Sequence, residues 1–168
     1  MPSTYTLISS NTLGSSASTI TFSSIPSTYT DLVLRISSRF DGNSSSLAIS
    51  FNGNTSSVYR NTYLSANGTT TETSQSGSTN IFLRGVNTST STANTFGNIE
   101  VYIPNYQVAA NKPFSSFGAN ENNATLATLE INAGLFLSTT AITSIGLSGD
   151  GYNFVSGSSF YLYGIKNS

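Results

Sequence analysis

The fold is decided by the stretch Asp31-Leu32-Val33-Leu34-Arg35-Ile36, in which apolar side chains recur at every second position. Leu32, Leu34 and Ile36 share one face of an extended chain. Val33 and Arg35 share the other. A helix would space its apolar positions by three and four residues, so a period of two indicates a β-strand with one face in the core.

The same alternation recurs along the chain, and no segment shows a sustained helical stripe. Further strands are expected at residues 4–9, 19–24, 47–51, 57–65, 81–84, 99–103, 114–119, 125–133, 142–147 and 160–163. Residues 124–133 carry Leu and Ala and leave a short helix as the alternative there. A series of about ten to twelve short strands separated by turn signals is typical of a sandwich or barrel. We therefore predict an all-β fold, an antiparallel jelly-roll-like β-sandwich of about ten strands, in a single domain over residues 1–168.

Gly, Asn and Ser mark the turns and the long connections. Asn52-Gly53-Asn54 predicts a hairpin turn. Residues 65–79 and 86–95 are rich in Ser, Thr, Asn and Gly, so we expect polar surface loops there, and residues 1–10 are a candidate N-terminal arm. These segments are either plain surface loops or contact arms that become ordered on assembly.

The composition excludes several classes of function. The 168 residues include six Lys or Arg and seven Asp or Glu, for a net charge of −1, and no His or Cys. Scattered basic residues do not make the electrostatic footprint of a nucleic-acid-binding protein. No run of about 18 apolar residues predicts a transmembrane helix, and the N-terminus lacks the basic and apolar regions of a secretory signal. We therefore expect neither nucleic acid nor a membrane as a partner, and synthesis in a cytoplasm.

The residues that usually carry catalysis are missing from the sequence. Without His and Cys, a Ser-His-Asp triad, a Cys-His pair and the usual zinc sites cannot form. The seven carboxylates show no diagnostic glycosidase pair, and no phosphate-binding motif occurs. Asp41-Gly42-Asn43 and Asp150-Gly151 could donate oxygens to calcium, but an ordinary Asx turn is the simpler interpretation. We expect no enzyme activity, no cofactor and no metal.

Four tyrosines near turns are the candidate contact residues: Tyr59, Tyr63, Tyr106 and Tyr152. An aromatic face flanked by amide side chains suits carbohydrate, so we predict that these residues contact a partner or face a glycan. The alternative is a tyrosine at the rim of the core with its hydroxyl in water.

Four segments give the chain a resemblance to a known group of proteins. In chain order they are Ile20-Thr21-Phe22-Ser23-Ser24-Ile25-Pro26-Ser27-Thr28-Tyr29-Thr30-Asp31-Leu32-Val33-Leu34, Phe51-Asn52-Gly53-Asn54 followed by Tyr59, Ile103-Pro104-Asn105-Tyr106, and Gly157-Ser158-Ser159-Phe160-Tyr161-Leu162-Tyr163-Gly164-Ile165. With these segments in this order, residues 4–166 resemble jelly-roll virion structural proteins of tailed bacteriophages, notably phages of aquatic bacteria. The group includes head decoration (cement) proteins and tail-associated proteins, and it offers no catalytic residues.

The resemblance implies a place in the virion. As a capsid decoration protein, the chain would bind the major capsid protein lattice as a homotrimer. Binding only the expanded lattice would stabilise the head by mass action, with residues 65–79 and 1–10 clamping neighbouring subunits. The alternative is a tail or head-fibre module that binds host surface glycans. Either role places the chain on the surface of a phage particle assembled in the host cytoplasm.

Overall fold

The computed structural model describes residues 4–166, apart from the side chains of residues 75 and 76, and the elements it contains are strands. They are β1 (Tyr5–Thr12), β2 (Thr19–Phe22), β3 (Asp31–Ser38), β4 (Ser46–Phe51), β5 (Tyr59–Ala66), β6 (Thr71–Ser78), β7 (Ile81–Arg84), β8 (Gly97–Ile103), β9 (Lys112–Glu121), β10 (Ala127–Phe136), β11 (Ile145–Gly149) and β12 (Ser159–Ile165). Within this described range, no helix has the length and hydropathy to cross a membrane.

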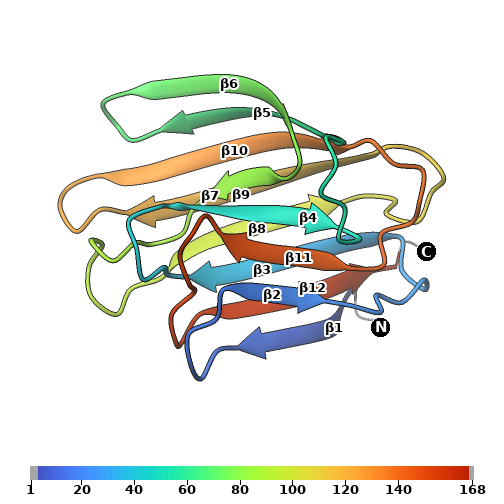
Figure 1. Ribbon diagram of the computed structural model, residues 1–168, viewed down its shortest axis with the longest axis horizontal. Helices are drawn as coiled ribbons and strands as arrows, with labels where there is room; N and C mark the ends of the chain where they lie inside the picture. The colour runs from blue at the N-terminus through green and yellow to red at the C-terminus, as the bar shows by residue number, and fades with distance from the viewer. Residues whose placement is uncertain (1–3, 167–168) are drawn as a thin grey trace.

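The strands form two stacked antiparallel sheets (Figure 1). The larger sheet has eight strands in the order β1-β12-β3-β8-β9-β10-β5-β6, and the smaller has four in the order β2-β11-β4-β7. Their inner faces share one apolar core, to which β3 contributes Leu32, Leu34 and Ile36. The predicted all-β sandwich is confirmed, although its twelve strands exceed the expected ten.

Eight of the strands follow the connectivity of a jelly roll. The first four strands and β7, β8, β11 and β12 form two groups, paired as β1-β12-β3-β8 and as β2-β11-β4-β7. Two hairpins are inserted into this plan, β5–β6 after β4 and β9–β10 after β8. The β9–β10 hairpin pairs with β8, and the β5–β6 hairpin follows it at the edge, so the larger sheet extends beyond β7, the edge of the smaller one (Figure 1).

The structure corrects the prediction of a polar loop over residues 65–79. This segment contains β6, which pairs with β5 from Tyr59↔Ser78 to Ala66↔Thr71. In the turn between the two strands, the Asn67 side chain accepts the backbone N–H of Thr70 at 2.8 Å. Ser and Thr occupy both faces of β6, so this strand has no hydrophobic alternation by which the sequence could reveal it.

Three other local expectations are also corrected. Residues 5–10 of the expected N-terminal arm belong to β1 and pair with β12, while residues 1–3 lie outside the described range. The helical alternative for residues 124–133 fails, because Ala127–Phe136 forms β10. Asn52 and Gly53 do form a tight turn, with φ of 55° and 62°. However, the chain after this turn crosses from the smaller sheet to the larger one, so no hairpin forms there.

An aromatic cluster joins the two sheets at one end of the core. The ring of Phe51 on β4 lies 5.3 Å from Phe114, 5.4 Å from Phe136 and 6.2 Å from Tyr59, measured between centroids. These three partners come from β9, β10 and β5. Phe51 therefore ties both inserted hairpins to the jelly-roll core.

Replacing Phe51 by Ala should lower the free energy of unfolding by about 3–5 kcal/mol, because it removes buried apolar area and leaves a cavity. Phe117→Ala, at a ring on the outer face of the larger sheet, is the control and should change this free energy by less than about 1 kcal/mol. Urea denaturation measures both, and equal losses would contradict a core centred on Phe51.

Candidate functional site

The edge strand β7 contacts the larger sheet through one carboxylate, that of Glu130, and one glycine, Gly118. The backbone N–H of Arg84 donates to Glu130 Oε1 of β10 at 2.9 Å. The Arg84 carbonyl lies against Gly118 of β9, where an added Cβ would come within 1.9 Å of the carbonyl oxygen. Unpaired sheet edges invite aggregation, and here the side chain of Glu130 satisfies a backbone donor of this edge.

Beyond β7 the usual alternation of apolar inside and polar outside is reversed. In the part of the larger sheet that β7 does not cover, the side chains on the inner face of β5 and β10 are polar or aromatic. They are Asn61, Tyr63, Ser65, Glu130 and Asn132. On the outer face of the same two strands lie Leu64, Leu129 and Ile131. An antiparallel sheet that covers a core normally shows the opposite pattern. The reversal produces two candidate surfaces, a polar cleft inside and an apolar face outside.

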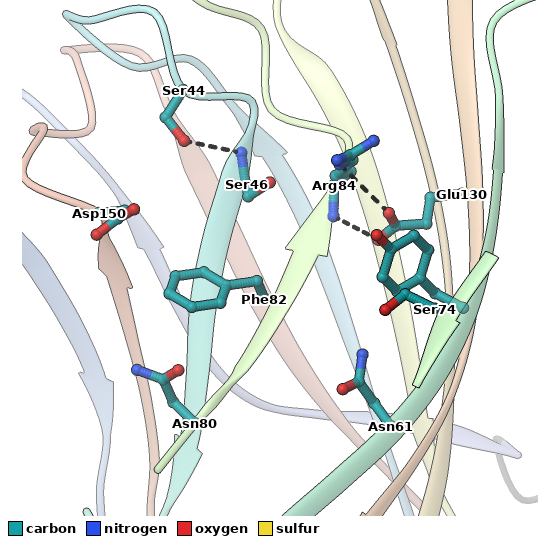
Figure 2. Close-up of a pocket in the computed structure, with 10 residues that line it drawn as sticks. Ser44, Ser46, Asn61, Ser74, Asn80, Phe82, Arg84, Glu130 and Asp150 are labelled. Atoms are coloured by element: carbon teal, nitrogen blue, oxygen red, sulfur yellow. Dashed lines mark hydrogen bonds and ion pairs between the residues drawn. The ribbon is translucent and has the colours of Figure 1, made fainter. Parts of the chain in front are cut away.

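The polar cleft lies between β7 and the β5–β6 hairpin and has a volume of about 370 Å³. Besides serines, its lining consists of two amides, two aromatic rings and three charged groups: Asn61, Asn80, Tyr63, Phe82, Arg84, Glu130 and Asp150. Figure 2 shows the ring of Phe82 between Asp150 and Asn80 on one side and the Arg84–Glu130 pair on the other. The cleft thus combines aromatic surface with hydrogen-bond donors and hydrogen-bond acceptors.

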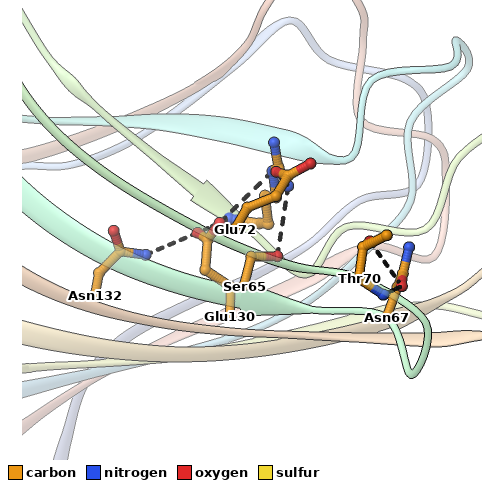
Figure 3. A network of polar contacts seen from close by, with 7 residues as sticks. Ser65, Asn67, Thr70, Glu72, Glu130 and Asn132 are labelled. Carbon is orange, nitrogen blue, oxygen red and sulfur yellow. Dashed lines mark hydrogen bonds and ion pairs between the residues drawn. The ribbon is translucent and has the colours of Figure 1, made fainter.

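Glu130 is the buried centre of a polar network in the wall of the cleft (Figure 3). In addition to the Arg84 N–H, its Oε1 accepts the side-chain amide of Asn132 at 2.8 Å. Arg84 Nε lies 3.6 Å from Glu130 Oε2, and Arg84 Nη1 donates to Glu72 on β6 at 3.1 Å. The Arg84 guanidinium therefore lies between Glu130 of β10 and Glu72 of β6 and is paired with both.

Tyr63 is the one predicted tyrosine that lines the cleft. It is partly exposed, and the Arg84 guanidinium lies 5.7 Å from the centroid of its ring. A cation over an aromatic face is attracted by the ring's quadrupole, so the Arg84 guanidinium favours the position of the Tyr63 ring beside it.

Tyr59 and Tyr106 do not face a partner, because both are buried in the core. The Tyr59 hydroxyl accepts the N–H of Phe51 at 2.8 Å and contacts the carbonyl of Asn54 at 3.1 Å. The Tyr106 hydroxyl donates to the Pro26 carbonyl. Burial raises the pKa of both phenols. Both rings lie near turns, but their hydroxyls bind backbone groups within the chain.

Tyr152 also has a structural role. Its ring lies on Gly42, where an added Cβ would come within 1.8 Å of the ring, and its hydroxyl donates to Asn43 Oδ1 at 2.7 Å. Close by, Asp41 Oδ1 accepts the N–H of Asn153 at 2.9 Å. The two turns that the sequence marked by Asp-Gly pairs therefore pack on one another. The described residues contain no group of three acidic side chains that could hold a metal ion.

The apolar outer face runs across four neighbouring strands of the larger sheet. Leu64, Ile131 and Phe117 are directly opposite one another across β5, β10 and β9. Their exposed fractions are 47%, 47% and 50%. Leu129 of β10 and Tyr102 of β8 extend this row, which we call the outer apolar row. Contiguous exposed apolar side chains commonly mark a protein–protein contact.

Residues 86–95 form the expected connection between β7 and β8, and they are held within the chain itself. Arg39 donates to the carbonyls of Thr92 at 2.6 Å and Ser91 at 3.1 Å. Glu121 of β9 accepts the N–H of Thr92 at 2.8 Å and the hydroxyl of Thr95 at 2.9 Å. This loop is therefore ordered without a partner.

Tyr59→Phe should lower the free energy of unfolding by about 1–3 kcal/mol, because it leaves the buried N–H of Phe51 without an acceptor. Tyr63→Phe removes the same atom from a partly exposed ring and should change this free energy by less than about 0.5 kcal/mol. Paired denaturant titrations measure the difference. A larger loss for Tyr63→Phe would contradict the assignment of Tyr59 to the core and Tyr63 to the cleft.

Acid should weaken the anchor of loop 86–95. The Asn123 backbone N–H, assisted by hydrogen bonds from Thr95 and Thr92, holds the pKa of Glu121 below its ordinary value of 4.5. The unfolded chain therefore binds the proton of Glu121 more readily than the folded chain does. The stabilisation that the Glu121 charge gives to the folded chain is complete above about pH 4.5 and is lost as the pH falls through the lower, folded-state pKa.

Glu121→Gln should therefore lower the unfolding temperature at neutral pH, and the difference from the unmodified chain should narrow below pH 4.5. Thermal unfolding followed by circular dichroism across the acid range measures this. A difference that stays constant with pH would show that the Glu121 charge does not anchor the loop.

No protein-family model matches the chain, and no curated protein matches it either. The cleft and the outer apolar row are therefore interpreted from their own residues. One is a polar cleft, and the other is a row of exposed apolar side chains on the opposite side of the same strands.

Proposed function

We propose that this chain is a structural protein of a tailed-bacteriophage virion, and that within the virion it is a capsid decoration protein. The observation that carries the proposal is the outer apolar row of Leu64, Ile131 and Phe117 with Leu129 and Tyr102. A row of this kind is costly to leave in water and gains free energy when a partner covers it.

The outer apolar row suits a permanent contact surface. Its side chains lie on β8, β9, β10 and β5, of which each is paired with a neighbour on both sides. Such strands are rigid before binding, so little conformational entropy is lost when the surface is covered. Protein interfaces are enriched in aromatic residues, and Phe117 and Tyr102 supply aromatic surface in the row.

A charged pair borders the row and can fix the orientation of the partner. Arg35 Nε donates to Glu100 Oε2 at 2.9 Å, and Glu100 lies directly opposite Phe117 across β8 and β9. Exposed pairs contribute little stability, but charges at the rim of an interface select orientation and partner.

The choice of a capsid lattice as the partner comes from the resemblance to phage virion proteins over residues 4–166. In this role the chain would act as a homotrimer that binds the major capsid protein only in the expanded head, so that binding stabilises the head by mass action. With no His, the contact has no group that ordinarily titrates between about pH 5 and 8.

Phe117→Ser combined with Ile131→Thr should weaken binding to expanded heads at least about tenfold, because the centre of the row loses its apolar area. The unfolding temperature should stay unchanged, since both side chains are half exposed. Val108→Ser, at an equally exposed residue away from the row, is the matched control. Co-sedimentation of purified chain with heads that lack it measures the affinity.

Quantitative mass spectrometry of purified particles tests the location. A copy number of the same order as that of the major capsid protein is expected. A copy number matching the tail, or heads that bind the double variant as well as the unmodified chain, would overturn the assignment to the capsid.

A further inference from the structure

We infer that the cleft between β7 and the β5–β6 hairpin is a binding site for a neutral saccharide. The site goes beyond the proposed structural role and does not depend on it. The outer apolar row lies on the other face of β5 and β10, and the cleft takes its residues from the inner face.

Phe82 has no evident role in the core. It lies on β7 between the buried residues Ile81 and Leu83, and its side chain is on the opposite face of the strand, on the side of Asp150 (Figure 2), where it lines the cleft. The ring is 42% exposed in a lining that is otherwise mostly polar. An aromatic face in a wet cleft suits the C–H face of a sugar ring, which is apolar while the rim of the ring carries hydroxyls.

The groups around Phe82 match the hydroxyl rim of a sugar. Asn80 and Asp150 lie on one side of the ring, and within the described part of the chain their side chains make no hydrogen bond. An amide both donates and accepts, and a carboxylate accepts, so together they can pair with neighbouring hydroxyls. On the other side, Ser74 of the hairpin supplies a hydroxyl. The Asn61 amide behind it donates to Asn132 Oδ1 at 3.2 Å and belongs to the wall of the cleft.

The charge balance of the cleft selects against anions. Arg84 is its only cation among the lining residues, and it is already paired with Glu130 and Glu72. Asp150 adds a further negative charge. A phosphate or an acidic sugar would be repelled by these carboxylates, and the Arg84 guanidinium, already paired, cannot offset that repulsion. A neutral saccharide carries no charge to be repelled.

The dimensions agree with a small carbohydrate. A volume of about 370 Å³ is near the lower end of known ligand pockets. The walls are preorganised, because Glu130 fixes Arg84 and Arg84 in turn lies on the ring of Tyr63. Groups held in place before binding reduce the entropy that binding must overcome.

A glycan array that carries neutral hexose and N-acetylhexosamine oligosaccharides beside acidic glycans tests the inference on the full chain. Binding to neutral glycans is expected. Phe82→Ala and, separately, Asn80→Ala should each weaken it at least about tenfold. Both residues are surface residues, and unchanged unfolding temperatures confirm that the variants fold.

The outer-face variant Phe117→Ser with Ile131→Thr is the matched control. It should keep glycan binding while losing attachment to heads, and Phe82→Ala should show the reverse. Absence of neutral-glycan binding, a preference for acidic glycans, or binding that survives both cleft variants would overturn the inference and leave the structural role intact.

Discussion

The contact of Glu130 with the backbone of β7 is the interaction on which the rest of the structure depends. A four-stranded sheet cannot cover an eight-stranded one, so one edge of the smaller sheet must end over the larger sheet's interior. At that edge Glu130 accepts the Arg84 N–H, and Gly118 allows the Arg84 carbonyl to approach β9. On one side of this contact the sandwich has an apolar core, and on the other the larger sheet stands without a covering layer.

The position of that contact explains the composition of both faces beyond it. A half-covered inner face would leave apolar side chains in a wet cleft, so the polar side chains of Glu130, Asn132 and Asn61 are found there, bonded to one another. A buried polar network stabilises a structure only when each of its donors and acceptors has a hydrogen-bond partner. Apolar positions of the same strands are then left on the outer face, where they favour a partner.

The sequence predicts strands well where hydrophobic alternation is present and fails where it is absent. Alternation at 31–36 correctly places β3 and its buried face, but the Ser- and Thr-rich β6 offers none, so its sequence predicts a loop where a strand forms. Alternation also cannot tell which parity is buried. In β10 the apolar residues Leu129 and Ile131 point outward, against the usual rule. Proximity to a turn placed Tyr59 and Tyr106 at the surface, whereas cross-strand packing buries them.

The reversed strand β10 makes the two surfaces separable. Neighbouring residues of a strand point to opposite faces, so the outward-facing Ile131 can change without altering the polar side chains of Glu130 and Asn132 in the cleft wall. The same geometry makes the register critical, because a slip by one residue would exchange the two faces. Continuous pairing of β10 with β9 from Ala127↔Glu121 to Phe136↔Lys112, and with β5 on its other side, opposes such a slip. Pairing of β10 with a neighbour on both sides is therefore what keeps a contact surface and a polar cleft on one strand distinct.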